Sequence, residues 1–499
     1  MKLYKSFGAV ALLALGMTIT GCSDWLDYTP KDKQTYDQQF STPDGFHTTV
    51  NGIYNSIFST NLYGRNLSYG AIEAMGACYS VTTSNASMNE YASGTWTGTY
   101  ASAGFSSIWS SAYTAILNTN VVLGALQEFP DVLTPNDSKM IEAELLALRA
   151  MLHFDLVRLF GPIPSSSPQG LTVPFANSTE IVKRDRMPLD SIMNYYIIPD
   201  LTTAQKMLKE VDPILTEGVL NTDGGDVGNW SRYRQIRLNY YAVTLLKARA
   251  YMWIGDYDNA LAEAKIITDG ADAQTTFPWV NPSTILGGPA RPDRVFSTEC
   301  LFGFYNSELK NVYDNNFAGS LDIGVLLQPR RSYISILFPN EADYRRQSQW
   351  TSSISTTSDF DFAKYRSFTP TTNSPEFWAT FYGLMRKSEA YLIKAECLMQ
   401  NDQLADAIDC LNEFRNHRGE TDVLATTTAA NFLKEIKFEY LREFRGEGQI
   451  YFNHKRNNQG FGQYSGGVYD FDASGKSSLT DQPSKAVRYN VPVPAAETI

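Results

Sequence analysis

Aromatic and amide side chains gather in two stretches of the sequence, residues 63–104 and 277–378. An aromatic ring can stack on the C–H face of a sugar, and asparagine amides can pair with its hydroxyl groups. Residues 63–104 have little helical periodicity, so we expect a long loop there, and we expect residues 277–378 to be a loop-rich insertion between helical segments. Long loops in compact domains commonly carry function. The candidate ligand-binding residues in the two stretches are Tyr69, Tyr79, Trp96, Trp279, Tyr313 and Asn316.

Trp96 is the first candidate among these rings because Gly94 and Gly98 lie close to it on either side. We expect Trp96→Ala to weaken glycan binding and to leave the melting temperature nearly unchanged. The alternative interpretation, for this ring and for each of the others, is that it packs its own loop onto the neighbouring helices. Both interpretations stay open at the level of the sequence.

The acidic residues do not form a recognisable catalytic pair. Glycosidases need two carboxylates on opposite sides of a cleft. Glu439, Glu443 and Glu447 instead follow helical spacings beside Arg442 and Arg445, a pattern typical of solvated faces with salt bridges. The sequence also lacks a nucleophile elbow, a P-loop and a dinucleotide-binding fingerprint. It therefore favours a binding protein over an enzyme.

Cysteine and histidine residues give no support for a metal site. Apart from Cys22 the cysteines are Cys78, Cys300, Cys397 and Cys410, and none belongs to a CxxC pair. The four histidines are scattered, without the spacing of a zinc-binding helix. We expect no metal and no cofactor. One disulfide is possible, but buried free thiols are the favoured interpretation.

The amino-terminal residues have the layout of an export signal. Lys2 and Lys5 precede an apolar run over residues 7–17, which is shorter than the about 20 residues that span a bilayer. Gly21 then precedes Cys22, which predicts a lipoprotein signal peptide over residues 1–21, lipidation of Cys22 and a tether over residues 22–42. The alternative is an ordinary signal peptide with a cysteine nearby by chance.

The charge balance narrows the class of ligand. The chain has 499 residues, with 42 basic and 53 acidic side chains and a formal net charge of −11. Such a chain lacks the positive potential with which proteins bind nucleic acid or anionic lipid. The acidic balance fits neutral ligands, although it does not by itself identify them.

Residues 43–499 are predicted to form a single, mainly α-helical domain. Apolar residues recur at helical spacing, and short apolar runs such as residues 301–305 are candidate strands. Helical patterning begins near Pro43, and the further predicted helices cover residues 108–126, 137–160, 189–209, 233–254, 257–268 and 429–444.

Two helix hairpins share a pattern of small residues. Ala248 and Ala260 flank the turn at residues 255–256, and Ala395 and Ala407 flank another turn with the same spacing. Small residues at such positions let two antiparallel helices approach closely, as in tetratricopeptide-type hairpins. The alternative is two unrelated hairpins in an all-α protein.

Six short segments follow one another along the chain in a recognisable order. They are residues 22–27 (CSDWLD), 52–54 (GIY), 147–164 (ALRAMLHFDLVRLFGPIP), 255–257 (GDY), 389–396 (EAYLIKAE) and 411–415 (LNEFR). With these segments the sequence resembles the SusD/RagB family of outer-membrane nutrient-binding lipoproteins, over essentially the whole chain after the predicted signal peptide.

The resemblance implies a fold of four tetratricopeptide-like helix hairpins that support a loop-rich ligand-binding face. It implies a lipid-anchored protein on the surface of the outer membrane, and Asp24 and Asp27 fit the acidic export signal that follows the lipidated cysteine. It also implies a partner, a SusC-like TonB-dependent transporter. The implied ligand is a glycan or oligosaccharide, which the protein captures and delivers to that transporter.

Two alternatives to glycan binding remain. Some members of the family bind peptides, so a peptide-binding lipoprotein is one alternative. The other is a scaffold subunit of the transporter complex that binds no small ligand.

Overall fold

The computed structural model describes most of the chain after the amino-terminal segment. Cys22, the predicted signal peptide and most of the predicted tether lie outside the described residues. The described residues are 35–76, 78–79, 81–221, 230–286, 291–322, 324–327, 331–352, 360–366, 377–421, 424–459, 463–465, 468–470 and 485–494.

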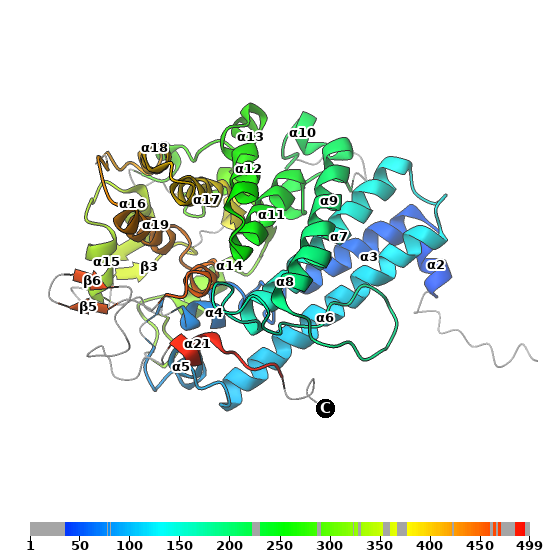
Figure 1. Ribbon diagram of the computed structural model, residues 1–499, viewed down its shortest axis with the longest axis horizontal. Helices are drawn as coiled ribbons and strands as arrows, with labels where there is room; N and C mark the ends of the chain where they lie inside the picture. Colours follow the sequence, from blue (N-terminus) through cyan, green and yellow to red (C-terminus); the bar gives the residue numbers. More distant parts are fainter. Residues whose placement is uncertain are drawn as a thin grey trace, which may run out of the picture.

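Helices dominate the described residues, as the sequence predicts (Figure 1). The longer helices are α3 (Pro43–Ile57), α6 (Thr99–Glu128), α7 (Pro135–Phe160), α9 (Ile198–Val211), α11 (Tyr240–Ile254), α12 (Tyr257–Thr268), α17 (Lys387–Gln400), α18 (Leu404–Asn416) and α19 (Ala429–Glu443). The shorter α-helices are α2 (Tyr36–Phe40), α4 (Ala71–Met75), α5 (Ala86–Ser93), α8 (Leu189–Ile192), α10 (Ile214–Glu217), α13 (Ala271–Thr276), α14 (Leu309–Asn316), α15 (Arg331–Leu337), α16 (Tyr344–Gln349), α20 (Ile450–Arg456) and α21 (Lys485–Tyr489). Single turns of other helix types are η2 (Met193–Ile197), η3 (Arg234–Ile236), η4 (Pro282–Thr284), η5 (Ser297–Glu299) and η6 (Phe377–Ala379).

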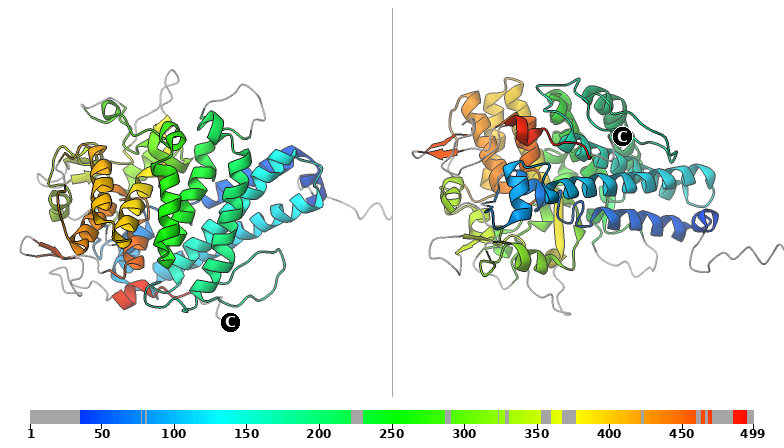
Figure 2. Two further views of the ribbon diagram at one scale, coloured as in Figure 1. Left: turned by 45° about the horizontal axis from the view of Figure 1, so that its top comes forward. Right: turned by 90° about the horizontal axis from the view of Figure 1, so that it is seen from below.

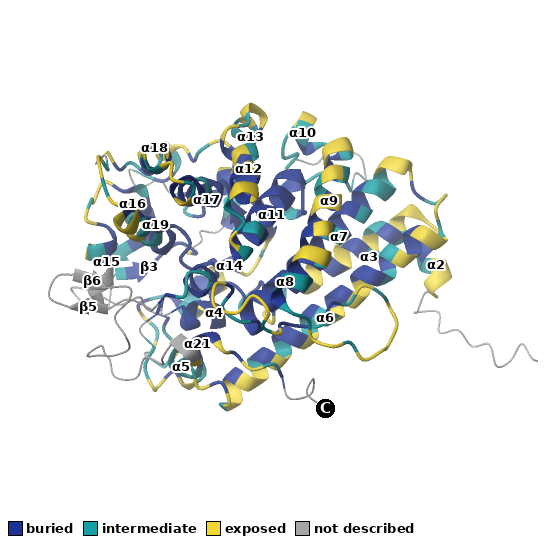
Figure 3. Cartoon of the chain, in the orientation of Figure 1, coloured by how far each residue is buried: buried dark blue, intermediate teal, exposed yellow. Residues whose placement is uncertain are grey.

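The long helices pack in a row that largely follows the order of the chain (Figure 2). Contacts link α6 to α7, α7 to α9, α9 to α11, α11 to α12, α12 to α17 and α17 to α18. Figure 3 shows that α11, near the middle of the row, is almost entirely buried, whereas α6 and α9 keep exposed outer faces. The row therefore forms one helical layer, and the buried hydrophobic residues of its helices belong to one cluster.

Local sequence signals place the ends of these helices. The side chain of Thr134 caps α7 by accepting from the backbone N–H of Asp137, and Pro135 occupies the first turn. Gly255 ends α11 with a φ of +77°, a backbone conformation that glycine adopts with little steric strain. The side chain of Asp256 then caps the start of α12. This turn closes the first of the two predicted hairpins.

The pattern of small residues is confirmed in the packing of both hairpins. Ala248 on α11 and Ala260 on α12 are fully buried, as are Ala395 on α17 and Ala407 on α18, and the two helices of each pair are in contact. Because the methyl side chain of alanine takes up little space between two helix backbones, the helices of each pair can pack closely.

The prediction of a long loop over residues 63–104 is wrong in part. The structure has α4, α5 and the first turn of α6 within this stretch. Ala101, Phe105 and Ile108 form a buried stripe on α6 at helical spacing. The surrounding Gly, Ser and Thr residues conceal this stripe in the sequence. Helix α11 begins at Tyr240 rather than at residue 233, because the chain first makes the tight turn η3.

Short antiparallel strand pairs complete the fold. Strand β1 (Cys300–Tyr305), predicted from its apolar run, pairs with β4 (Phe381–Arg386). The other pairs join β2 (Trp350–Ser352) to β3 (Phe360–Phe362), and β5 (Gln463–Ser465) to β6 (Val468–Asp470).

The glutamates of α19 are not on a solvated face, so that prediction is wrong. Glu439 and Glu443 are fully buried, and Arg345 from α16 pairs with both at 2.8 Å and 3.0 Å. Arg386 from β4 and Arg418 from the segment after α18 also pair with Glu443, at 2.5 Å and 2.6 Å. A salt bridge at helical spacing does form, between Arg442 and Glu439 at 2.6 Å. The face is buried because further arginines come from distant segments that the fold brings together.

The described residues also bear on membrane spanning, metal binding and the state of the cysteines. None of the helices in this part of the chain combines the length and apolarity needed to cross a bilayer. Within the same residues no cluster of His, Cys, Asp or Glu side chains could hold a metal ion. Cys78, Cys300, Cys397 and Cys410 are buried free thiols, as predicted.

Candidate functional site

A two-compartment groove lies where three segments of the chain meet, residues 51–69, 230–237 and 304–316. Its compartments have volumes of about 450 Å³ and 390 Å³, within the usual range for ligand pockets. Both are lined by the shared residues Asn55, Phe58, Phe304 and Tyr305, so they adjoin. The asparagine compartment is also lined by Thr60, Gly64, Tyr69, Asn306, Glu308, Asn311, Val312, Asn315 and Asn316. The arginine compartment is also lined by Asn51, Tyr54, Trp230, Arg232, Tyr233, Ile236 and Arg237.

The end of β1 and the end of α3 build the floor of the groove. Strand alternation turns Phe304 inward, where it is buried, and Tyr305 outward. The ring of Phe58, just after α3, stacks on Phe304 with centroids 4.3 Å apart. Asn51 and Asn55, four residues apart on α3, are both exposed, and their amides border the floor.

Tyr305 presents the most exposed aromatic ring of the groove. Its side chain is 41% exposed, and its ring makes edge-to-face contacts with Phe377 and Phe381 at centroid distances of 5.4 Å and 6.2 Å. Partial burial raises the pKa of Tyr305 to about 12, so its hydroxyl stays protonated at neutral pH and can donate a hydrogen bond. A fixed ring with a polar tip suits a ligand that has both C–H faces and hydroxyl groups.

Helix α14 lines the asparagine compartment with amides. Asn311 and Asn315 are four residues apart on α14 and both are exposed, so they border the compartment from one face of the helix. The amide nitrogen of Asn316 donates to the carbonyl of Val312 at 2.9 Å, within the helix. Glu308 accepts from Asn311 and adds a carboxylate to the rim. Each amide offers both donors and acceptors, as recognition of a polyhydroxyl ligand requires.

A buried ion cluster fixes the segment that lines the arginine compartment. Arg234 is fully buried and pairs with Glu144 at 2.6 Å and with Asp212 at 2.8 Å. Beside it, Tyr233 has a φ of +56°, a sparsely populated conformation for a residue other than glycine. Its backbone N–H donates to Leu220 at 3.0 Å. The ion pairs of Arg234 and the backbone hydrogen bond to Leu220 therefore fix the position of Tyr233 in the groove.

Arg237 joins the groove to the same cluster. Its guanidinium donates to Glu144 at 3.2 Å and to the amide oxygen of Asn51 at 2.6 Å. It also lies 4.7 Å from the centre of the Trp230 ring, on which His47 stacks at 4.6 Å. Burial lowers the pKa of His47, so this imidazole is neutral at pH 7. Trp230 is thus held by its neighbours.

The groove contains two of the six side chains predicted to bind a ligand. Tyr69 lines the floor of the asparagine compartment, where it is largely buried and touches Phe317 edge-on at 5.9 Å. Asn316 lines the same compartment from the end of α14. Tyr313 is buried and Arg366 lies 5.9 Å from its ring, so the neighbouring Val312 lines the groove in its place.

The other three predicted side chains are engaged elsewhere among the described residues. Trp96 is only 8% exposed, its indole N–H donates to the carbonyl of Val487 at 2.7 Å, and its ring packs against Phe105. Tyr79 is buried and donates to the carbonyl of Tyr69 at 2.6 Å. These rings support the groove or the core and do not face it.

Trp279 is the third of these side chains and lies between charged and aromatic neighbours. His417 stacks on its ring at 4.4 Å, and the ammonium group of Lys387 lies 4.1 Å from its centre. Trp279 is half-buried, and it does not line either compartment of the groove.

The sequence reasoning missed most of the groove. Asn51, Asn55 and Phe58 lie on α3 or at its end, and Trp230 and Tyr233 lie in a segment without a motif. Tyr305 could have been found, because alternation along the predicted strand 301–305 places its last residue on the side opposite to Phe304. Asn306, Asn311 and Asn315 lie in the amide-rich stretch 277–378. The groove residues on α3 and in the segment 230–237 give no such signal, since only the fold brings them together.

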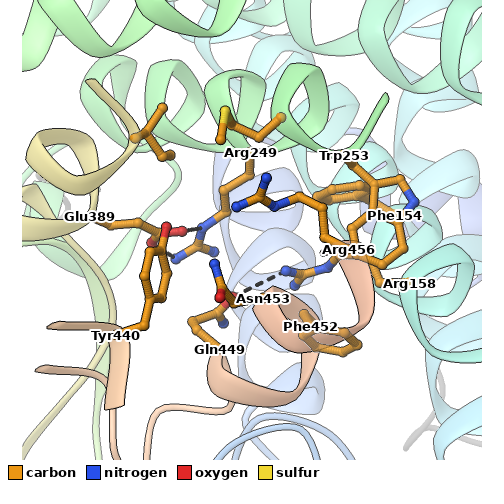
Figure 4. A pocket seen from close by; sticks show the side chains of 12 residues that line it. Phe154, Arg158, Arg249, Trp253, Glu389, Tyr440, Gln449, Phe452, Asn453 and Arg456 are labelled. Atoms are coloured by element: carbon orange, nitrogen blue, oxygen red, sulfur yellow. Dashed lines mark hydrogen bonds and ion pairs between the residues drawn. The ribbon is translucent and has the colours of Figure 1, made fainter. Parts of the chain in front are cut away.

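A second cavity is structural in character. It encloses only about 30 Å³ where α7, α11, α17 and α20 meet, enough for about one water molecule and too small for a sugar ring. Figure 4 shows the arginines that point into it. Arg249 pairs with Glu389 at 2.5 Å, and Arg158 donates to Gln449 at 3.1 Å. The ion pair and the hydrogen bond around this cavity link its helices, and the cavity is too small for a nutrient ligand.

Two family models match separate parts of the chain. A model described as "Starch-binding associating with outer membrane" matches residues 24–214, and a model described as "SusD family" matches residues 309–498. SusD-like protein P2 of Formosa agariphila is 25% identical over 215 residues, which make up 42% of this chain. The match spans 39% of the length of that relative.

Solved structures share the fold over nearly the whole chain. A SusD-like carbohydrate-binding protein from Bacteroides vulgatus has a TM-score of 0.67 and 18% identity, with 92% of this chain and 96% of that chain covered. A SusD superfamily protein from Bacteroides thetaiotaomicron has a TM-score of 0.67 and 19% identity, with coverage of 92% and 97%. The predicted mainly α-helical, SusD-like fold is therefore confirmed. The two family models, which match residues 24–214 and 309–498, show that the chain belongs to the SusD/RagB family.

Proposed function

We propose that this protein captures oligosaccharides from glycans in the two-compartment groove, at the outer membrane. The observation that carries the proposal is the exposed, supported ring of Tyr305 on a floor bordered by the amides of Asn55, Asn311 and Asn315. A stacking surface surrounded by amides matches the alternating C–H faces and hydroxyl groups of a sugar chain. The two adjoining compartments suit an extended ligand better than a single sugar.

Membership of the family supports a cellular setting for the proposed site. The model that matches residues 24–214 describes starch-binding proteins associated with the outer membrane. We propose that Cys22 carries the lipid anchor and that a SusC-like TonB-dependent transporter receives the bound glycan. Binding without hydrolysis is part of the proposal, because two carboxylates facing each other across the groove are not found among its described lining residues.

Calorimetric titration against a panel of oligosaccharides and peptides tests the proposal. The protein used starts after residue 22, so that lipidation does not interfere. We expect at least one oligosaccharide to bind and to remain intact on prolonged incubation. Binding of peptides alone would support the peptide alternative, and binding of neither class would support a scaffold subunit.

A matched pair of variants links binding to the groove. Asn311→Ala combined with Asn315→Ala removes two amides from the rim, and we expect affinity to fall by more than tenfold. The control is Asn118→Ala, which removes an exposed amide from α6 outside the groove lining. Equal affinity of both variants and the unmodified protein would place the ligand elsewhere.

A further inference from the structure

Exposed aliphatic side chains gather in one loop, residues 163–188 between α7 and α8. Ile181 is fully exposed, and Val182 and Leu171 are 55% and 53% exposed. Keeping such side chains in water is unfavourable, and adjacent exposed apolar residues are typical of a surface that meets another one. The outer part of the loop, residues 177–186, is mostly exposed and is called the exposed tip below.

Polar bonds hold the chain in place just before the exposed tip. The hydroxyl of Tyr113 donates to the carbonyl of Pro174 at 2.7 Å, and the side-chain amide of Asn120 donates to the carbonyl of Ala176 at 3.0 Å. The backbone N–H of Ala176 donates to Nε2 of His153, also at 3.0 Å. Helices α6 and α7 therefore position the exposed tip, and it loses little conformational entropy when it meets a second surface.

Basic side chains follow the aliphatic pair directly. Lys183 is exposed, and Arg184 and Arg186 donate to backbone carbonyls of the same loop. Among the residues that the structure describes, these three form no ion pair with an acidic side chain. With Glu180 and Asp185, the exposed tip has three basic and two acidic side chains, which gives it a net charge of +1 in a chain whose net charge is −11.

This combination of groups matches a lipid surface. Aliphatic side chains are taken up at the boundary between headgroups and acyl chains, and adjacent cations are attracted to lipid phosphates. A protein partner would need a pocket shaped to receive the exposed tip, whereas a fluid lipid layer accommodates it without one. The pattern therefore favours lipid over protein.

The position of the loop in the molecule agrees with contact to a membrane. The loop and α2 lie toward the same end of the molecule in Figures 1 and 2. Helix α2 begins at Tyr36, fourteen residues after Cys22, and a chain of that length spans at most about 50 Å. If Cys22 is lipidated as proposed, this end of the molecule stays near the membrane.

We propose that the exposed tip contacts the lipid surface of the outer membrane. Ile181 and Val182 enter the boundary between headgroups and acyl chains, and Lys183 lies beside the lipid phosphates. The contact gives the tethered protein a second attachment and so restricts its orientation on the membrane. This inference rests on the lipid anchor of the proposed function and does not depend on which glycan is bound.

A fluorescent probe on the exposed tip tests the contact. A thiol-reactive nitrobenzoxadiazole probe labels Ile181→Cys at one site, because the other thiols of the chain are the lipidated Cys22 and the buried Cys78, Cys300, Cys397 and Cys410. The lipidated protein is reconstituted into vesicles of phosphatidylethanolamine and phosphatidylglycerol. We expect the emission to shift to the blue and to be quenched by nitroxide groups on the acyl chains.

The matched control places the same probe on another exposed aliphatic position. Val325 is 50% exposed and lies between α14 and α15. A probe on Val325→Cys should keep the emission that it has in water, with and without vesicles.

Variants without the lipid anchor show which groups carry the contact. The protein that starts after residue 22 is sedimented with the same vesicles. We expect Ile181→Ser combined with Val182→Ser to lower the partition coefficient by about tenfold, and Val325→Ser to leave it unchanged. Lys183→Gln should weaken binding to these anionic vesicles and not to vesicles of phosphatidylcholine alone.

The outcomes separate this inference from the proposed function. A probe on Ile181→Cys that keeps its emission in water, or equal sedimentation of all variants, would overturn the lipid contact. A blue shift that requires outer-membrane vesicles with their native proteins would also overturn it, in favour of a protein partner. Failure of the lipidated protein to float with vesicles in a density gradient would instead overturn the proposed anchor.

Discussion

Tyr305 combines an exposed ring with edge-to-face contacts to Phe377 and Phe381. We expect Tyr305→Ala to weaken oligosaccharide binding by about tenfold, since an aromatic contact of this kind contributes about 0.5–1.5 kcal/mol. Tyr305→Phe should keep most of the affinity because it keeps the ring. Calorimetric titration measures the effect, and Tyr195→Ala, which removes a 75% exposed ring outside the groove lining, is the control. Unchanged affinity of Tyr305→Ala would show that this ring is not a ligand contact.

Trp96 illustrates the opposite case, a loop aromatic that packs the protein. Its ring contacts Phe105 and its indole N–H donates to Val487, more than three hundred residues along the chain. We expect Trp96→Ala to lower the free energy of unfolding by about 3–5 kcal/mol, as is typical when a large buried ring is removed. Urea unfolding followed by circular dichroism measures this change. A stable variant with reduced glycan affinity would restore the expectation based on the flanking glycines.

At the scale of elements, the segment from Trp230 to Arg237 depends on the buried charge of Arg234. Arg234→Met leaves Glu144 and Asp212 buried with one partner fewer, and we expect a loss of about 3–5 kcal/mol in unfolding free energy. The control is Lys139→Ala, which breaks an exposed ion pair with Glu210 and should cost less than about 1 kcal/mol. Equal unfolding midpoints for the two variants in urea would contradict this account of how the segment is anchored.

Helix α7 ends against the buried side chain of Lys455 from α20. The ammonium nitrogen donates to the carbonyls of Leu159 and Gly161 at 2.9 Å and 2.7 Å, and burial lowers the pKa of Lys455 to about 7. Between this pKa and the unfolded value near 10.5, the unfolded chain binds one proton more than the folded one. Stability from this group is therefore present at high pH and is lost as the pH falls through about 7.

We expect the stability of the unmodified protein to rise between pH 7 and pH 9 relative to that of Lys455→Met. The difference in slope should approach 1.4 kcal/mol per pH unit, the upper limit for one proton. Urea unfolding at several pH values measures both slopes, and their comparison removes the contribution of the other titrating groups. Parallel slopes would show that Lys455 keeps an ordinary pKa in the folded protein.

At the scale of the whole molecule, the fold was more accessible from the sequence than the site was. The span predicted for α12 matches the structure, and the alanines of the two hairpins lie where their spacing predicts. Helical periodicity and small residues are local signals, so one sequence suffices to detect them. The buried glutamates of α19 and the groove depend instead on segments far apart in the chain, which no local pattern brings together.

A crystal structure of the protein with the oligosaccharide that binds most tightly tests the central claim most directly. We expect a sugar ring stacked on Tyr305, with hydroxyl groups bonded to Asn55 or Asn315 and the chain extending toward Arg232. An oligosaccharide bound at another surface, with the groove unoccupied, would contradict the account.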